Sequence, residues 1–134
     1  MDKSDKTRPL LLVAERDPFM RDTLRRTLGE RFDLEFVDDG AAVIQKAKER
    51  SPALIILEVL LPTLDGFQVC RRLKNDSDTR HIPVLMFTSL LAEKRAAQAG
   101  CDGFLLKPLH RDRLLQKIHH LLTRASKGDR EGES

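Results

Sequence analysis

The sequence has few aromatic side chains. It contains no Trp and no Tyr, and the aromatic fraction is 4% of 134 residues. Proteins that bind single-stranded nucleic acids stack the bases on aromatic side chains, for which this composition offers little. The net charge is +3, because 24 Lys and Arg are interspersed with 21 Asp and Glu. We therefore expect no direct binding to nucleic acid.

Segments that would place the chain in or across a membrane are also missing. No apolar run approaches the ~18 residues that span a bilayer. The start of the chain, MDKSDK, lacks the apolar core of a secretion signal. We expect a cytoplasmic protein without membrane contact.

Cysteine and histidine do not form a recognisable metal or catalytic motif. Cys70 and Cys101 are too few for a disulfide framework and lack the spacing of metal ligands. Their apolar surroundings favour small core residues over redox chemistry. No nucleophile with a matching base is visible, so the sequence does not predict an enzyme. All four histidines are predicted at the surface or partly packed: His81, His110, His119 and His120.

Five short apolar segments alternate with five helical patterns. The apolar segments are residues 10–14, 34–37, 54–57, 82–87 and 104–106. Helices are predicted from Pro18 to about Phe32, near 41–48, after Asp65, over about 91–99 before a left-handed cap at Gly100, and over 114–122. This alternation with short connections predicts an α/β fold, a doubly wound five-stranded parallel sheet.

The length suits one domain. We assign residues 8–125 to this domain and residues 1–7 to an N-terminal extension. Residues 126–134 show no apolar periodicity, and we predict a flexible C-terminal tail there.

Polar residues follow four of the predicted strands. In open parallel sheets, ligands bind beyond the carboxyl ends of the strands, so these side chains are expected to lie near one another. They are Glu15, Arg16 and Asp17 after the first strand, Glu58 after the third, Thr88 after the fourth, and Lys107 with Pro108 after the fifth.

This set, together with the Leu61-Pro62-x-x-Asp65-Gly66 turn and the Lys107-Pro108 pair, resembles a response-regulator receiver domain of two-component signalling, of the CheY-like type. The resemblance covers about residues 8 to 124. It implies a flavodoxin-like sheet with strand order 2-1-3-4-5 and a cis bond between Lys107 and Pro108. The residues at the family's site positions are Glu15 and Arg16 for the acidic pair, Glu58 for the phospho-acceptor, Thr88 for the hydroxyl, Phe104 for the aromatic switch and Lys107 for the lysine.

Two of these positions depart from the family pattern. The phospho-acceptor is Asp in the family and is Glu58 here, and Arg16 replaces an acidic residue that holds Mg²⁺. A guanidinium at that position repels a divalent cation, so we expect Mg²⁺ binding to be lost or weak. The extra methylene of Glu58 also shifts the attacking oxygen, and we expect phosphorylation to fail with the metal.

Two roles for Glu58 are compatible with the sequence. The carboxylate can extend toward Thr88 and Lys107 and mimic a phosphorylated Asp. Alternatively, it forms a structural ion pair with Arg16 or Lys107, and the correlated change at position 16 favours Arg16 as the partner.

The sequence thus predicts a pseudo-receiver that is independent of phosphorylation and acts through protein–protein contacts. In the family, the last two helices and the fifth strand form the output face. Here that face would bind a histidine kinase, an output protein or a second copy of the chain, and it would include Leu90, Leu91, Lys94, Arg95, Phe104, Arg111, Arg113 and Lys117.

Two alternatives remain open at this point. The first is a conventional receiver that accepts a phosphoryl group in a histidine-kinase phosphorelay. The second is a small-molecule-binding flavodoxin-like module, although no glycine-rich phosphate loop follows the first strand.

Overall fold

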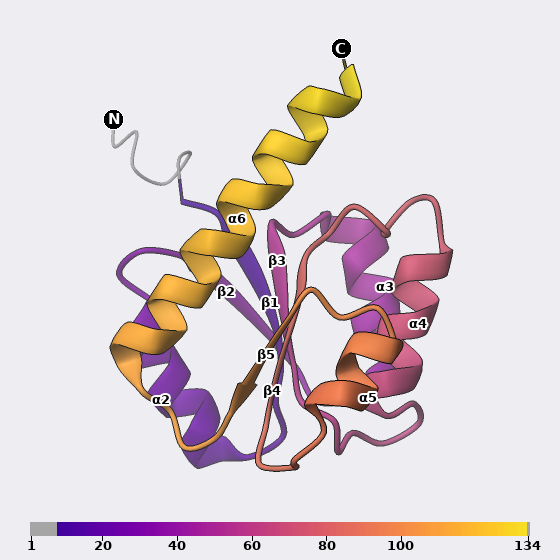
Figure 1. Ribbon diagram of the computed structural model, residues 1–134. Helices are drawn as coiled ribbons and strands as arrows, with labels where there is room; N and C mark the ends of the chain where they lie inside the picture. The colour runs from indigo at the N-terminus through magenta and orange to yellow at the C-terminus, as the bar shows by residue number, and fades with distance from the viewer. Residues whose placement is uncertain (1–7, 134) are drawn as a thin grey trace.

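The computed structural model describes residues 8–133, and the predicted extension at residues 1–7 lies outside that range (Figure 1). One parallel sheet has the order β2-β1-β3-β4-β5, which confirms the predicted topology. Its strands are β1 (Leu10–Ala14), β2 (Asp33–Val37), β3 (Leu54–Leu57), β4 (Val84–Thr88) and β5 (Gly103–Leu106). The register pairs Ala14 with Val37 and Leu57, and Thr88 with Leu106, so the carboxyl ends of the strands share one edge.

Helices cover both faces of the sheet (Figure 1). They are α2 (Pro18–Leu28), α3 (Gly40–Arg50), α4 (Gly66–Asn75), α5 (Glu93–Gln98) and α6 (Arg111–Glu133). One apolar core lies between the sheet and α3, α4 and α5, and a second lies between the sheet and α2 and α6. The central strand β3 is buried on both faces, as its uniformly apolar sequence predicts.

Side-chain caps explain where the helices begin. Asp17 accepts a hydrogen bond from the backbone N–H of Phe19, and Pro18 stands in the first turn. Asp65 forms a capping box with Gln68, in which each side chain accepts from the other residue's backbone N–H. These caps orient α2 and α4 directly beside the carboxyl ends of β1 and β3.

Several element boundaries differ from prediction. Helix α2 ends at Leu28 with Gly29 as its C-cap, before the predicted Phe32. Strand β4 begins at Val84, after Pro83, whose nitrogen cannot donate to a neighbouring strand. Helix α6 is 23 residues long and continues through most of the segment predicted as a tail. Helix propensity does not account for this extension, because the segment contains Gly128 and Gly132.

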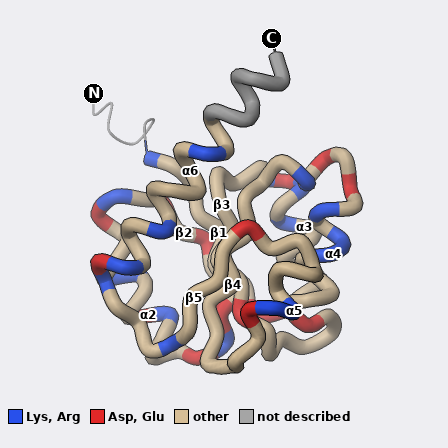
Figure 2. Tube along the Cα trace, viewed as in Figure 1, with Lys and Arg blue, Asp and Glu red and all other residues tan. Residues whose placement is uncertain are grey.

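Charges of both signs are interspersed along the chain (Figure 2). Of the described helices, none combines the length and apolarity required to cross a membrane.

Candidate functional site

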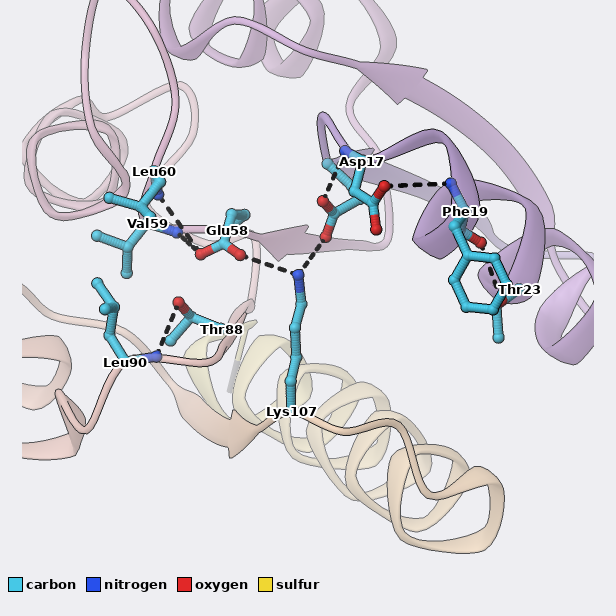
Figure 3. Close-up of polar contacts among 10 residues, drawn as sticks. Asp17, Phe19, Thr23, Glu58, Val59, Leu60, Thr88, Leu90 and Lys107 are labelled. Atoms are coloured by element: carbon cyan, nitrogen blue, oxygen red, sulfur yellow. Dashed lines mark hydrogen bonds and ion pairs between the residues drawn. The ribbon is translucent and has the colours of Figure 1, made fainter.

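Lys107 joins two carboxylates at the carboxyl edge of the sheet. Its Nζ lies 2.8 Å from Oε1 of Glu15 and 2.9 Å from Oε1 of Glu58. The three residues follow β5, β1 and β3, so the ion pairs connect three strand ends (Figure 3). The structure thus brings together three of the predicted site residues.

Glu58 is held on both carboxylate oxygens. Oε1 accepts from Lys107, whereas Oε2 accepts from the backbone N–H of Val59 at 2.5 Å and of Leu60 at 3.4 Å (Figure 3). The residue is 8% exposed. Gly66 packs against this segment so closely that an added Cβ would lie 2.5 Å from the carbonyl oxygen of Glu58. The glycine of the predicted turn is therefore required by close backbone contact.

Glu15 is also buried and has a second partner. Its Oε2 accepts from the backbone N–H of Asp17 at 3.0 Å, while Oε1 faces Lys107. The backbone N–H of Glu15 donates to Val37 at the end of β2. The sequence did not predict this contact of Asp17, which links the site to the first turn of α2.

Arg16 does not take the place that the sequence favoured for it. Its side chain is exposed, and within residues 8–126 it forms no ion pair with Glu58. Adjacent residues of an extended segment point in opposite directions, so Glu15 turns inward and Arg16 turns outward. The partner of Glu58 is Lys107, the other residue that the sequence left open.

The ion pairs shift two pKa values. Burial alone would raise the pKa of Glu58, but the Thr88 hydroxyl, the Lys107 ammonium and the Val59 N–H outweigh it and lower the pKa. Burial alone would lower the pKa of Lys107, but its two carboxylate partners reverse this effect and raise the pKa. Both shifts favour the charged forms of Glu58 and Lys107.

Thr88 and Phe104 occupy the remaining switch positions. Thr88 is fully buried, and its hydroxyl accepts from the backbone N–H of Leu90 at 3.4 Å (Figure 3). Its carbonyl accepts from the backbone N–H of Lys107, and the Lys107–Pro108 peptide bond is cis, as the resemblance implied. Phe104 is half-buried and packs against the core beneath α3, α4 and α5.

Among the described residues, no group of three or more His, Cys, Asp or Glu side chains lies in a suitable arrangement for a metal ion. The carboxylates of Glu15 and Glu58, which follow β1 and β3, both pair with the Lys107 ammonium. All four histidines are exposed, in agreement with prediction.

A groove of about 750 Å³ lies between α5, β5 and the start of α6. Leu91 is 91% exposed at its rim, and Leu106 is 40% exposed. The groove coincides with the face predicted to bind partners, and its lining includes Leu91, Lys94, Phe104, Leu105, Leu106 and Arg113.

Known proteins resemble the chain over nearly all of its length. Residues 11–119 match the family described as response regulator receiver domain. The response regulator MprA of Mycolicibacterium vanbaalenii is 34% identical over 126 residues, which are 92% of this chain and 54% of that protein. The DNA-binding dual master transcriptional regulator RpaA of Synechocystis is 34% identical and is covered over 51% of its length. The chain thus spans about half the length of these curated relatives.

Solved structures agree with this match. The signal receiver domain of a signal transduction histidine kinase from Syntrophus aciditrophicus is 32% identical, with a TM-score of 0.79 over 86% of this chain and 90% of that one. The chemotaxis response regulator CheY4 of Vibrio cholerae has a TM-score of 0.78 over 85% of this chain and 98% of its own, and at 23% identity it supports the fold alone.

Proposed function

The chain belongs to the response regulator receiver family, and we propose that it works there as a pseudo-receiver, which signals through protein–protein contacts without accepting a phosphoryl group. The observation that carries this proposal is the position of Lys107. Its ammonium lies within 2.9 Å of two buried carboxylates that occupy the acidic and acceptor positions. The chain's own ammonium therefore offsets one of the two negative charges of the site.

The same contacts support our inference that Mg²⁺ binding is lost. Mg²⁺ takes oxygen ligands in near-ideal octahedral geometry, and in proteins one or two of these ligands are usually carboxylates. Here an ion would have to displace Lys107 from Glu15 and Glu58. The second residue of the family's acidic pair is Arg16 in this chain, and it is exposed. We propose that the site binds no divalent cation at cellular concentrations.

Glu58 is also badly placed to act as a nucleophile. One oxygen is paired with Lys107 and the other accepts two backbone N–H groups. Phosphoryl transfer requires an oxygen aligned with the incoming phosphorus and a charge that neutralises the transferring oxygens. The second requirement is met in the family by the metal. We propose that Glu58 instead holds Lys107 permanently and so fixes the switch in one state.

The groove beside α5 and β5 is the proposed contact surface. Two basic residues, Lys94 and Arg113, and one acidic residue, Glu93, line the groove beside its exposed leucines. This lining fits a partner with an apolar segment flanked by acidic side chains. A histidine kinase or an output protein in the cytoplasm would present such a segment, and self-association through this face is the alternative outcome.

The proposal is tested with acetyl phosphate and beryllofluoride, each with and without Mg²⁺. We expect no mass gain and no change in the amide spectrum of the wild-type chain. The matched control is the double variant Arg16→Asp with Glu58→Asp, which restores the family's site and should respond to both reagents only when Mg²⁺ is present. A phosphoryl adduct on Glu58 of the wild-type chain would overturn the proposal.

A conventional receiver is the second candidate. It is favoured by the retention of Thr88, Phe104 and Lys107 at the switch positions and by the cis peptide bond after Lys107. The same experiment decides between the two functions, because this candidate requires a Mg²⁺-dependent response of the unaltered chain.

A further inference from the structure

Cys70 and Cys101 lie side by side although 30 residues separate them in the chain. The Sγ atoms are 3.0 Å apart, and both residues are free cysteines. Cys70 lies on the inner side of α4 and is buried, whereas Cys101 precedes β5 and is only partly buried. Neither thiol takes part in the Lys107 site.

The turn after α5 places Cys101 in this position. The backbone N–H of Cys101 donates to Ala96 and that of Gly100 donates to Ala97, which is the pattern of a Schellman motif. Gly100 has φ +94°, a left-handed conformation that favours glycine. The residue after such a glycine characteristically packs against the preceding helical turn, and here it also reaches α4.

An ion pair beside the thiols holds the same two segments together. Lys74, one turn after Cys70, lies 2.7 Å from the carboxylate of Asp102, the residue after Cys101. Lys74 also donates to the carbonyl of Ile82 at 2.7 Å. The hydrogen bond from Cys101, followed by the positive charges of Lys74 and Arg71, lowers the pKa of the Cys70 thiol. The same hydrogen bond, together with burial, raises the pKa of the Cys101 thiol, so Cys70 is the thiolate of the pair.

We propose that Cys70 and Cys101 are a redox modification site, at which a hydroperoxide converts the two thiols into an intramolecular disulfide. The Cys70 thiolate attacks one oxygen of a peroxide that enters past the partly exposed Cys101, which breaks the O–O bond and leaves a sulfenic acid on Cys70 and water or an alcohol. The Cys101 thiol then attacks this sulfur, the S–O bond breaks, and the thiol proton leaves with the displaced hydroxide as water. Two thiols are oxidised by two electrons and the peroxide is reduced.

Little movement is needed to form the bond. The sulfurs must approach by about 1 Å to reach the ~2.0 Å of a disulfide. The resulting bond would tie α4 to the end of α5, directly before β5, and would enclose β4 and α5 in one covalent loop. Thr88 and most of the groove lining at α5 belong to this loop. Oxidation would therefore restrain the segment that forms the proposed contact surface.

The experiment treats the folded full chain with hydrogen peroxide and follows intact mass and unreduced peptide maps. We expect the loss of two hydrogens, a cross-linked peptide pair that contains Cys70 and Cys101, and full reversal by dithiothreitol. The melting temperature should rise by roughly 5–10 °C on oxidation, because the cross-link restricts the unfolded chain. Peroxide that leaves both thiols unchanged, or that adds oxygen to one cysteine without a cross-link, would overturn the proposal.

Two single variants complete the test. Cys70→Ser removes the attacking thiolate and should leave Cys101 in the reduced form after peroxide treatment, with no rise in melting temperature. Cys101→Ser should stop at a sulfenic acid on Cys70, which a dimedone probe detects after the protein is denatured. If Cys70→Ser does not fold, the wild type and Cys101→Ser still decide the outcome. Oxidation that proceeds only in urea would show that the native fold does not promote the bond, and it would count against the proposal.

Discussion

Lys107 Nζ and Glu58 Oε1 lie 2.9 Å apart at the carboxyl edge of the sheet. The contact joins the ends of β3 and β5, between which β4 lies in the sheet. A single ammonium also reaches Glu15, so three strand ends depend on one side chain. Five predictions follow from this site, its surroundings and the groove.

Replacing Lys107 by Met should destabilise the protein. Glu15 and Glu58 would remain buried without their cation and would repel each other. We expect a loss of roughly 2–4 kcal/mol in the free energy of unfolding, measured by urea denaturation. Lys94→Met is the control, because Lys94 is exposed and its loss should have little effect. A neutral Lys107→Met would show that the ion pairs contribute nothing to stability.

Low pH should reduce the stability of the fold, because Glu58 becomes protonated. Its pKa in the folded chain lies below the ordinary value of 4.5, so the carboxylate stabilises the fold above pH 4.5. This stabilisation is lost as the pH falls from 4.5 through the lowered pKa, because the unfolded chain takes up the proton first. Urea titrations across this range should show a smaller acid loss for Glu58→Gln than for the wild type.

High pH should also reduce the stability of the fold, because Lys107 loses its proton. Its pKa in the folded chain lies above the ordinary value of 10.5, so its stabilisation is complete below pH 10.5 and is lost as the pH rises through the higher pKa. Compared with the wild type, Lys107→Met should show a flatter stability profile in this range. Equal slopes for both proteins would contradict the raised pKa.

Gly66→Ala should disturb both the fold and the site. The added Cβ would lie 2.5 Å from the carbonyl oxygen of Glu58 and 2.8 Å from the Cα of Val59, and backbone atoms cannot easily move away. We expect a destabilisation of about 2–4 kcal/mol by urea denaturation. Ala97→Gly, on the exposed side of α5, should cost only about 1 kcal/mol.

Leu91→Asp should abolish partner binding without affecting stability. Its side chain is 91% exposed at the rim of the groove, so no core contact is lost. The comparison variant is Phe19→Ser, at the start of α2, where the Phe is 72% exposed. Sedimentation velocity reports self-association, and affinity capture from the native host followed by mass spectrometry reports other partners. Equal binding by both variants would exclude the groove as the contact surface.

Much of the fold follows from local patterns in the sequence. The bounds of β1 and β3 match their apolar segments, and Asp65 and Gly100 act as the caps that their residue types predict. Strand–helix alternation and the family's order together predicted the arrangement of the sheet. The strands and caps depend on residues close together in the sequence. The order of the strands is further limited by the general rule that crossover connections are right-handed.

The side-chain partners were harder to predict. The sequence favoured Arg16 as the partner of Glu58, but the extended backbone turns its side chain to solvent. The contact between Cys70 and Cys101 depends on how the turn after α5 meets α4, which no spacing in the sequence indicates. The end of α6 was missed because no apolar periodicity marks it and because Gly128 and Gly132 are poor helix formers.

Asp17 gives the site a direct connection to another part of the molecule. Its backbone N–H holds Glu15, while its side chain caps α2, whose first turn carries the exposed Phe19. A rearrangement of Glu15 would release this N–H and loosen the cap in the same step. A ligand that binds at Phe19 would in turn bias the position of Glu15, because the coupling between two sites is reciprocal. A single residue therefore joins the start of α2 to Glu15, on a part of the molecule separate from the groove at α5.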